Sequence, residues 1–153
     1  GLRFFTVYGP YGRPDMAYYK FVKAIMDDKE ISVFNNGEME RDFTYIDDVV
    51  ESINLIMGAP PKPNSSKFTY SNAPFKIFNI GNNNPVNLNE FINIIEDYCG
   101  KKAIKKYLPM QPGDVVKTFA NIDDLIQEFQ FKPKTKIKEG LKNFIDWYLE
   151  YKS

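Results

Sequence analysis

Residues 2–8 form a run, Leu-Arg-Phe-Phe-Thr-Val-Tyr, in which nearly every side chain is apolar, aromatic or β-branched. Such a run is typical of a strand that is covered on both faces within a parallel sheet. A single strand has no partner, so other segments must supply the rest of its sheet. Glycines and prolines at 9–15 then predict a loop, and apolar spacing at 16–28 predicts a helix. This order of strand, loop and helix predicts an α/β fold.

The remaining segments continue the alternation of short strands and amphipathic helices. We expect strands at 31–34, 42–46, 75–80 and 104–108, and helices at 47–57, 88–99, 122–129 and 137–151. Asn87 and Glu90 have the spacing of a capping box, and Asp47 and Asp48 are interpreted as caps of the helix that follows them. Residues 60–74 are rich in Pro, Ser, Asn and Lys, which predicts a flexible loop.

Composition excludes several kinds of chemistry. The chain of 153 residues has no histidine, which removes Ser-His-Asp catalysis and histidine-based zinc sites. Cys99 is the only cysteine, so we expect no internal disulfide, no metal site and a reducing, cytoplasmic location. Acidic and basic residues balance at 20 each, so no overall field favours nucleic acid or membranes, and no spanning segment or secretory signal is evident.

Arginine is rare and therefore informative. Only three of the 20 basic residues are arginines, at positions 3, 13 and 41. Arg41 precedes the strand at 42–46, where its five-donor fork suits a phosphate or carboxylate; the alternative is a solvated strand end. Arg13 follows the strand at 2–8 and is expected to face a crevice together with Thr6, unless it lies in solvent.

No catalytic residue is evident within the chain. The pattern Tyr-x-x-x-Lys occurs at Tyr19, Tyr98 and Tyr148, but ten tyrosines and many lysines produce such matches by chance. Tyr19 shares an apolar stripe with Val22 and Met26, which favours a packing role. There is also no GxGxxG after a strand, so the chain has no local dinucleotide fingerprint.

Three segments together carry a resemblance to a known family: residues 3–16, 41–50 and 108–115. With 78–82 and 143–148, they resemble the carboxyl-terminal, substrate-binding half of the NAD-dependent nucleotide-sugar epimerases of the extended short-chain dehydrogenase/reductase family. Within that family the similarity is greatest to the UDP-glucuronate 4-epimerases, and it covers essentially the whole chain.

The resemblance implies a fold and a partner domain. Residues 1–8 would be the last part of a Rossmann-type parallel sheet, and residues 9–153 a nucleotide-sugar-binding region. The amino-terminal Rossmann domain, which in this family binds NAD and carries the catalytic tyrosine and lysine, has no counterpart here. The chain, which begins at Gly1, is therefore interpreted as a piece of a longer homodimeric isomerase that is inactive by itself.

The resemblance also implies site residues. Phe4 and Phe5 correspond to positions that pack against the nicotinamide end of NAD, and Arg41 to the arginine on the diphosphate. Gln111 stands where many relatives carry arginine. The other implied positions contact the sugar, the diphosphate, the uracil or the ribose of a UDP-sugar, with Asp15 and Met16 at the diphosphate and sugar; they are Thr6, Arg13, Asp15, Met16, Ser32, Val33, Phe34, Pro112, Gly113, Asp114 and Thr118.

Three functions remain open. The first is interconversion of UDP-glucuronate and UDP-galacturonate, in which Arg13 and Thr6 lie near the sugar carboxylate. The second is a 4,6-dehydratase or decarboxylase of the same family. The third is a non-catalytic nucleotide-sugar sensor or RNA-binding relative, suggested by the lysines at 101–106 and 132–138 and disfavoured by the balanced charge.

Overall fold

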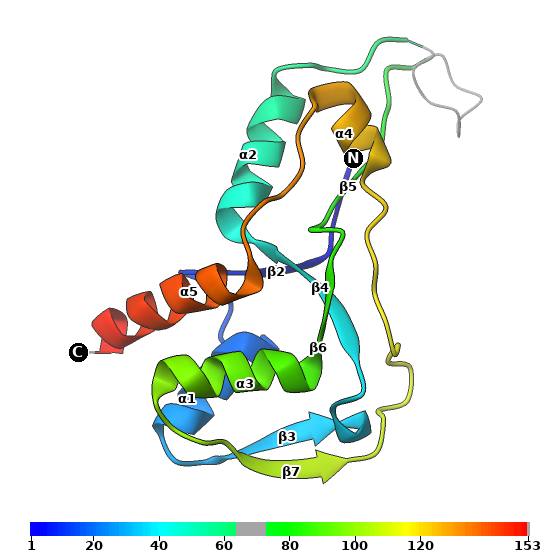
Figure 1. Cartoon of the computed structure of the whole chain (residues 1–153). Coiled ribbons are helices and arrows are strands. Elements are labelled where there is room, and N and C mark those ends of the chain that lie inside the picture. Colours follow the sequence, from blue (N-terminus) through cyan, green and yellow to red (C-terminus); the bar gives the residue numbers. More distant parts are fainter. Residues whose placement is uncertain (64–72, 153) are drawn as a thin grey trace.

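The fold is a mixed α/β arrangement of short parallel and antiparallel strands (Figure 1). The computed structural model describes residues 1–63 and 73–152, so most of the predicted loop at 60–74 lies outside the described residues. The helices are α1 (Ala17–Met26), α2 (Ile46–Met57), α3 (Leu88–Cys99), α4 (Asp123–Phe129) and α5 (Ile137–Lys152). The strands are β1 (Leu2–Phe4), β2 (Thr6–Tyr8), β3 (Glu30–Phe34), β4 (Glu40–Tyr45), β5 (Phe78–Ile80), β6 (Pro85–Asn87) and β7 (Ile104–Leu108).

The predicted single strand at 2–8 is divided into two strands at Phe5. β1 pairs in parallel with β5, whereas β2 pairs in parallel with β4, so the two halves join different sheets. The Phe5 N–H donates to the Ile80 carbonyl at 3.1 Å, which fixes the end of the first pairing. Phe4 is 48% exposed, so the described residues leave its face of β1 uncovered.

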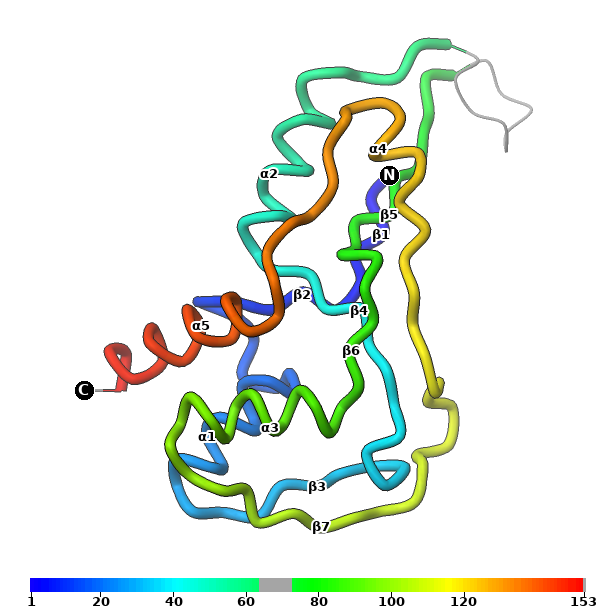
Figure 2. Tube along the Cα trace, in the orientation of Figure 1, coloured from blue at the N-terminus to red at the C-terminus, as the bar shows by residue number. Residues whose placement is uncertain are grey.

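Strand β4 connects the two halves of the molecule. It lies between β2 and the antiparallel β6, and in Figure 1 it runs from the lower end, which holds α1 and α3, up to the end that holds α2 and α4. A separate two-stranded sheet, β3 with β7 in parallel, closes the lower end (Figure 2). Residues of β4 therefore contact elements at both ends of the molecule, and side chains of this strand can line a site between them.

Two apolar cores hold these layers together. The larger lies among α1, α3 and α5, where Phe43 of β4 stacks on Phe91 of α3 with ring centroids 4.3 Å apart. The smaller lies between α2, α4 and the β1–β5 pair and includes Phe78, Ile80 and Leu125. Both form where the predicted helices present their apolar stripes to the sheets.

The helix start at 46–48 differs from the prediction. Tyr45 is the residue before α2, with no capping bond from its side chain, and Asp47 is exposed. Asp48 is only 2% exposed and accepts from the backbone N–H groups of Lys134 and Thr135 at 3.3 and 3.0 Å. It joins α2 to the segment before α5, so its interpretation as a cap of its own helix is wrong. Asn87, by contrast, caps α3 as predicted by accepting from the Asn89 N–H at 2.8 Å.

A buried carboxylate joins α3 to β7. Glu96 is 4% exposed and contacts Lys102 and Lys105, each at 2.8 Å, and the Ala103 N–H at 3.2 Å. Burial opposes its ionisation, but the lysines and the N–H group more than offset burial and lower the pKa of Glu96 to about 2 from 4.5.

We therefore expect Glu96 to contribute to acid stability. Because its folded-state pKa lies below the unfolded value, the contribution is present above pH 4.5 and is lost as the pH falls toward 2. Glu96→Gln should lower the free energy of unfolding at pH 7 by about 2 kcal/mol. It should also flatten the pH dependence between pH 5 and 2. Urea unfolding across this range measures both effects, with the exposed Asp97→Asn as control; equal slopes in all three proteins would contradict the assignment.

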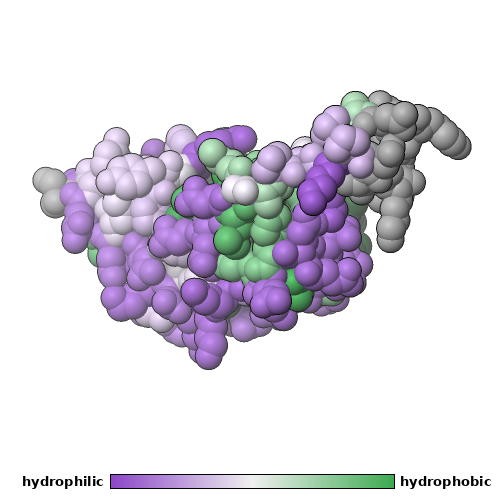
Figure 3. All heavy atoms as spheres, turned by 90° about the horizontal axis from the view of Figure 1, so that it is seen from above, coloured by the Kyte–Doolittle hydropathy of each residue, from purple (hydrophilic) through white to green (hydrophobic). Residues whose placement is uncertain are grey.

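Apolar side chains are exposed at the upper end of the molecule. Seen from above, the middle of this face is apolar between hydrophilic margins (Figure 3). Three exposed apolar residues belong to α2, namely Val50, Leu55 and Met57, the last with 75% exposure. None of the described helices is both long and apolar enough to cross a membrane.

Candidate functional site

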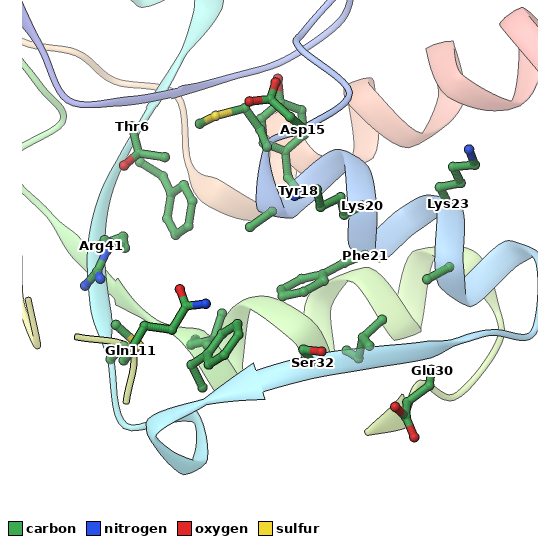
Figure 4. Close-up of a pocket in the computed structure, with 18 of the residues that line it drawn as sticks. Thr6, Asp15, Tyr18, Lys20, Phe21, Lys23, Glu30, Ser32, Arg41 and Gln111 are labelled. Atoms are coloured by element: carbon green, nitrogen blue, oxygen red, sulfur yellow. The ribbon is translucent and has the colours of Figure 1, made fainter. Parts of the chain in front are cut away.

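A cavity of about 810 Å³ lies between α1, β3, β4 and the segment at 109–114. Figure 4 shows α1 on one side and β3 on the other, with Thr6, Arg41 and Gln111 at one end and Lys23 and Glu30 at the far end. The cavity lies where α1, the β3–β7 sheet and β4, which belongs to a different sheet, face one another. Its shape is that of an elongated slot, suited to an extended ligand.

Arg41 lies at the end of this slot with its guanidinium held in place. Its Nη2 contacts Asp114 Oδ1 at 2.6 Å, and its Nη1 donates to the carbonyls of Glu40 and Val116 at 2.9 and 3.3 Å. The side chain is 21% exposed. A guanidinium that is fixed on a strand and still reached by solvent is arranged to receive an anion, which would compete with Asp114 for it.

Most predicted substrate residues line this cavity. The loop and helix start before α1 contribute Asp15 and Met16, and the segment after β7 contributes Gln111 and Asp114. The complete set of predicted residues that the structure brings together here is Thr6, Asp15, Met16, Ser32, Phe34, Arg41, Gln111 and Asp114.

Five predicted substrate residues do not line this cavity; one of them, Thr118, lines a second cavity beside it, and the other four lie elsewhere. Arg13 is 75% exposed at its side chain and pairs with Asp15 at 2.5 Å, which lowers the pKa of that carboxyl. Val33 is fully buried in the larger core, because alternate residues of β3 face opposite sides. Pro112 and Gly113 lie exposed in the turn that the Asp114 N–H closes on the Gln111 carbonyl.

A second cavity of about 610 Å³ adjoins the first. It is lined by Phe4, Phe5, Arg3, Asn79 and Thr118, and it shares Thr6 and Met16 with the first cavity. The predicted cofactor residues Phe4 and Phe5 therefore lie next to the predicted sugar residue Thr6. Their aromatic rings suit a flat, apolar ring system.

Asp42 organises the backbone behind Arg41. It is fully buried, and its carboxylate accepts from the N–H groups of Asn82, Asn83 and Ala120 at 2.8, 3.1 and 2.8 Å. Its own N–H donates to Thr118 Oγ1 at 3.0 Å. Burial raises the pKa of Asp42, and these hydrogen bonds oppose that rise. Asp42 thus joins β4, the turn after β5 and the segment at 117–120 beside the cavity.

The sequence interpretation did not identify Asp42 or the apolar wall of the slot. That wall consists of Tyr18, Phe21, Met39, Phe43, Val86 and Leu88. Their apolar spacing signals core packing as well as ligand contact, so sequence alone does not separate the two roles. The one available signal for Asp42 was a carboxylate inside an apolar strand, which requires a buried partner.

The lining of the two cavities combines charged and apolar side chains, which suits binding of a ligand with an anionic and an aromatic part. An arginine and a carboxylate flank one end, aromatic and aliphatic side chains form the walls, and no described lining residue is a histidine or cysteine. The described residues also contain no group of three His, Cys, Asp or Glu side chains that could hold a metal. Tyr19 lies 9% exposed against Phe144 and Tyr148, which confirms its packing role.

Comparison with known proteins gives a consistent result. The chain is 54% identical to protein CapI of Staphylococcus aureus over 99% of this chain and 47% of CapI. It is 47% identical to a probable UDP-glucuronate 4-epimerase of Rhizobium meliloti, over 95% of this chain and 45% of that protein. The chain therefore spans about half the length of the curated relatives it matches.

Structural comparison agrees. The fold matches the crystal structure of UDP-glucuronic acid 4-epimerase from Bacillus cereus in complex with UDP-glucuronic acid and NAD. The TM-score is 0.83 at 32% identity, over 98% of this chain and 45% of that one. The sequence model of the NAD dependent epimerase/dehydratase family matches residues 1–81, which is more than half of the chain. The chain belongs to the NAD dependent epimerase/dehydratase family, and its fold is that of the corresponding part of the extended short-chain dehydrogenases/reductases.

Proposed function

We propose that this chain is the substrate-binding part of an NAD-dependent UDP-sugar 4-epimerase that interconverts UDP-glucuronate and UDP-galacturonate. The observation that carries the proposal is the placement of Arg41 at one end of the slot, between Thr6 and Gln111 (Figure 4). A diphosphate at Arg41 would place the base along β3, beside Ser32 and Phe34, and the sugar toward Thr6. Relatives described as UDP-glucuronate 4-epimerases support this choice of substrate.

The second cavity fits the nicotinamide end of NAD. Phe4 and Phe5 line it, Asn79 and Thr118 add polar groups, and Thr6 and Met16 lie on its boundary with the substrate slot. When bound there, NAD supplies the hydride acceptor for C4 of the sugar. The chain's own contribution is to hold the sugar at this boundary and the diphosphate at Arg41, while the acid–base groups and most NAD contacts come from the partner Rossmann domain. We expect a cytoplasmic homodimer that needs neither nucleic acid nor membrane.

Preference for a uronic acid rests on Arg13. The Arg13 guanidinium now pairs with Asp15, which lines the slot, so a sugar carboxylate would exchange with Asp15 for the same fork. Because Arg13 is highly exposed, this exchange costs little desolvation. A positive partner for the carboxylate favours UDP-glucuronate over UDP-glucose.

We expect Arg13→Ala to weaken UDP-glucuronate binding by about fivefold to tenfold while UDP-glucose binding changes little. Calorimetry of the full-length protein with both ligands measures this difference. Arg13→Lys, which keeps the charge but not the fork, should give an intermediate loss. Equal losses for the two sugars would remove Arg13 from the choice of substrate.

Product analysis of the full-length enzyme tests the proposed reaction. With UDP-glucuronate and NAD, we expect UDP-galacturonate to appear until the two sugars reach equilibrium, with no loss of mass from the nucleotide sugar. Release of carbon dioxide from UDP-glucuronate would identify a decarboxylase. A 4,6-dehydratase needs a sugar with a C6 hydroxyl, so a product lighter by water from UDP-glucose would identify that activity. No turnover combined with tight, steeply salt-dependent RNA binding would favour the non-catalytic alternative.

A further inference from the structure

A cluster of aromatic side chains connects helix α5 to the loop that carries Asp15 and Met16. Tyr11 lies in this loop, and its ring is 5.1 Å from that of Trp147 in α5. Trp147 in turn stacks on Tyr151 at 5.2 Å with an interplanar angle of 19°. None of the residues of α5 lines either cavity, so this contact reaches the site only through the loop.

Tyr11 has two properties that general packing does not explain. Tyr11 is 86% exposed, so its side chain adds almost nothing to the core. Its backbone φ is 58°, in the left-handed region that disfavours a residue with a large side chain. A strained, exposed aromatic residue persists where surrounding contacts hold it, and the ring of Tyr11 contacts that of Trp147.

The loop passes directly from Tyr11 to the substrate slot. Gly12 packs so closely on the Tyr18 hydroxyl that a Cβ atom there would overlap it, and Tyr18 lines the slot. The Met16 N–H then donates to the Arg13 carbonyl at 3.2 Å, and Arg13 pairs with Asp15. Tyr11 is thus linked to Tyr18, Asp15 and Met16 through the close contact of Gly12 and the bonds of Arg13.

From the position of these contacts we infer that Tyr11 and Trp147 form a clamp that positions the 9–16 loop for the nucleotide sugar. The inference rests on the proposed function, because the ligand that the loop contacts is the UDP-sugar. Tyr11 is a positioning residue, because it contacts α5 and acts on the ligand only through Asp15 and Met16.

Fluorescence gives a direct test, because Trp147 is the only tryptophan of the chain. In the full-length protein its signal is obtained by subtracting the emission of a Trp147→Phe variant. UDP-glucuronate should change Trp147 emission with the same midpoint that calorimetry gives for binding. Tyr11→Leu should abolish this change and weaken binding about threefold to tenfold. Its thermal unfolding midpoint should stay close to that of the unmodified protein, because the residue is exposed.

Two control variants separate the clamp from general packing around the tryptophan. Tyr11→Phe keeps the ring and should retain both the emission change and the affinity. Tyr151→Leu removes the ring that is stacked on Trp147 and should leave UDP-glucuronate binding unchanged. Unaltered binding in Tyr11→Leu, or an equal loss in Tyr151→Leu, would overturn the clamp while the proposed function stands. Absence of any UDP-sugar binding by the unmodified protein would overturn the proposed function and the clamp together.

Discussion

Replacing Arg41 by alanine is expected to weaken UDP binding by about tenfold or more, equivalent to about 1.4 kcal/mol. The change removes a charge-assisted, two-point contact with the diphosphate. The expected loss is limited because Asp114 already neutralises Arg41, at 2.6 Å, and must be displaced by the ligand. Titration calorimetry of the full-length protein with UDP measures the effect.

The controls for Arg41 address charge and geometry separately. Arg41→Lys keeps the positive charge but cannot form a planar fork, so we expect it to recover only part of the affinity. Lys117→Ala removes a nearby cation that pairs with Glu40 at 2.6 Å and lines neither cavity. It should leave UDP affinity unchanged. An Arg41→Ala protein with unaltered affinity for UDP would contradict the assigned role.

Replacing Asp42 by alanine is expected to cause the largest loss of stability, about 3–5 kcal/mol in the free energy of unfolding. Three backbone N–H groups, of Asn82, Asn83 and Ala120, would lose their acceptor in a fully buried position. Asp42→Asn should lose less, because its amide oxygen still accepts, although its NH₂ group faces donors. Urea unfolding of each protein measures the difference.

Asp47→Ala is the matched control for Asp42, since this carboxylate is exposed at the start of α2. We expect a loss of less than about 1 kcal/mol, from the favourable interaction of an acid with a helix start. If Asp42→Ala and Asp47→Ala lost equal stability, the three hydrogen bonds to Asp42 would not be what holds the segment at 117–120 beside the site.

The helices could be predicted from sequence because their signals are local. α1, α3 and α5 lie within two residues of the expected bounds, and Gly100 ends α3 in the left-handed conformation expected of a glycine there. The strands were harder, because pairing depends on distant segments. Nothing local in residues 2–8 signals that β1 joins β5 while β2 joins β4. The strand β6 was missed because its three residues begin with a proline.

The candidate site was predictable where the resemblance supplied positions and less so elsewhere. Asp47 and Asp48 look equivalent in sequence, yet successive helix positions face different directions, so one is exposed and the other is buried against the segment before α5. Arg13 and Arg41 also look alike, but Arg41 is fixed on a strand whereas Arg13 lies in a loop and pairs with its neighbour Asp15. Only the tertiary structure distinguishes the two members of each pair, because their local sequence patterns are alike.

A crystal structure of the full-length protein with UDP bound would show whether Arg41 holds the diphosphate. We predict the uracil beside Ser32 and Phe34, which line the slot. The diphosphate oxygens should lie within about 3 Å of the Arg41 guanidinium, at charge-assisted hydrogen-bond distance. Asp114 should then have moved off its 2.6 Å contact with Arg41. A UDP molecule bound elsewhere, with the Arg41–Asp114 pair intact, would show that Arg41 does not bind the diphosphate.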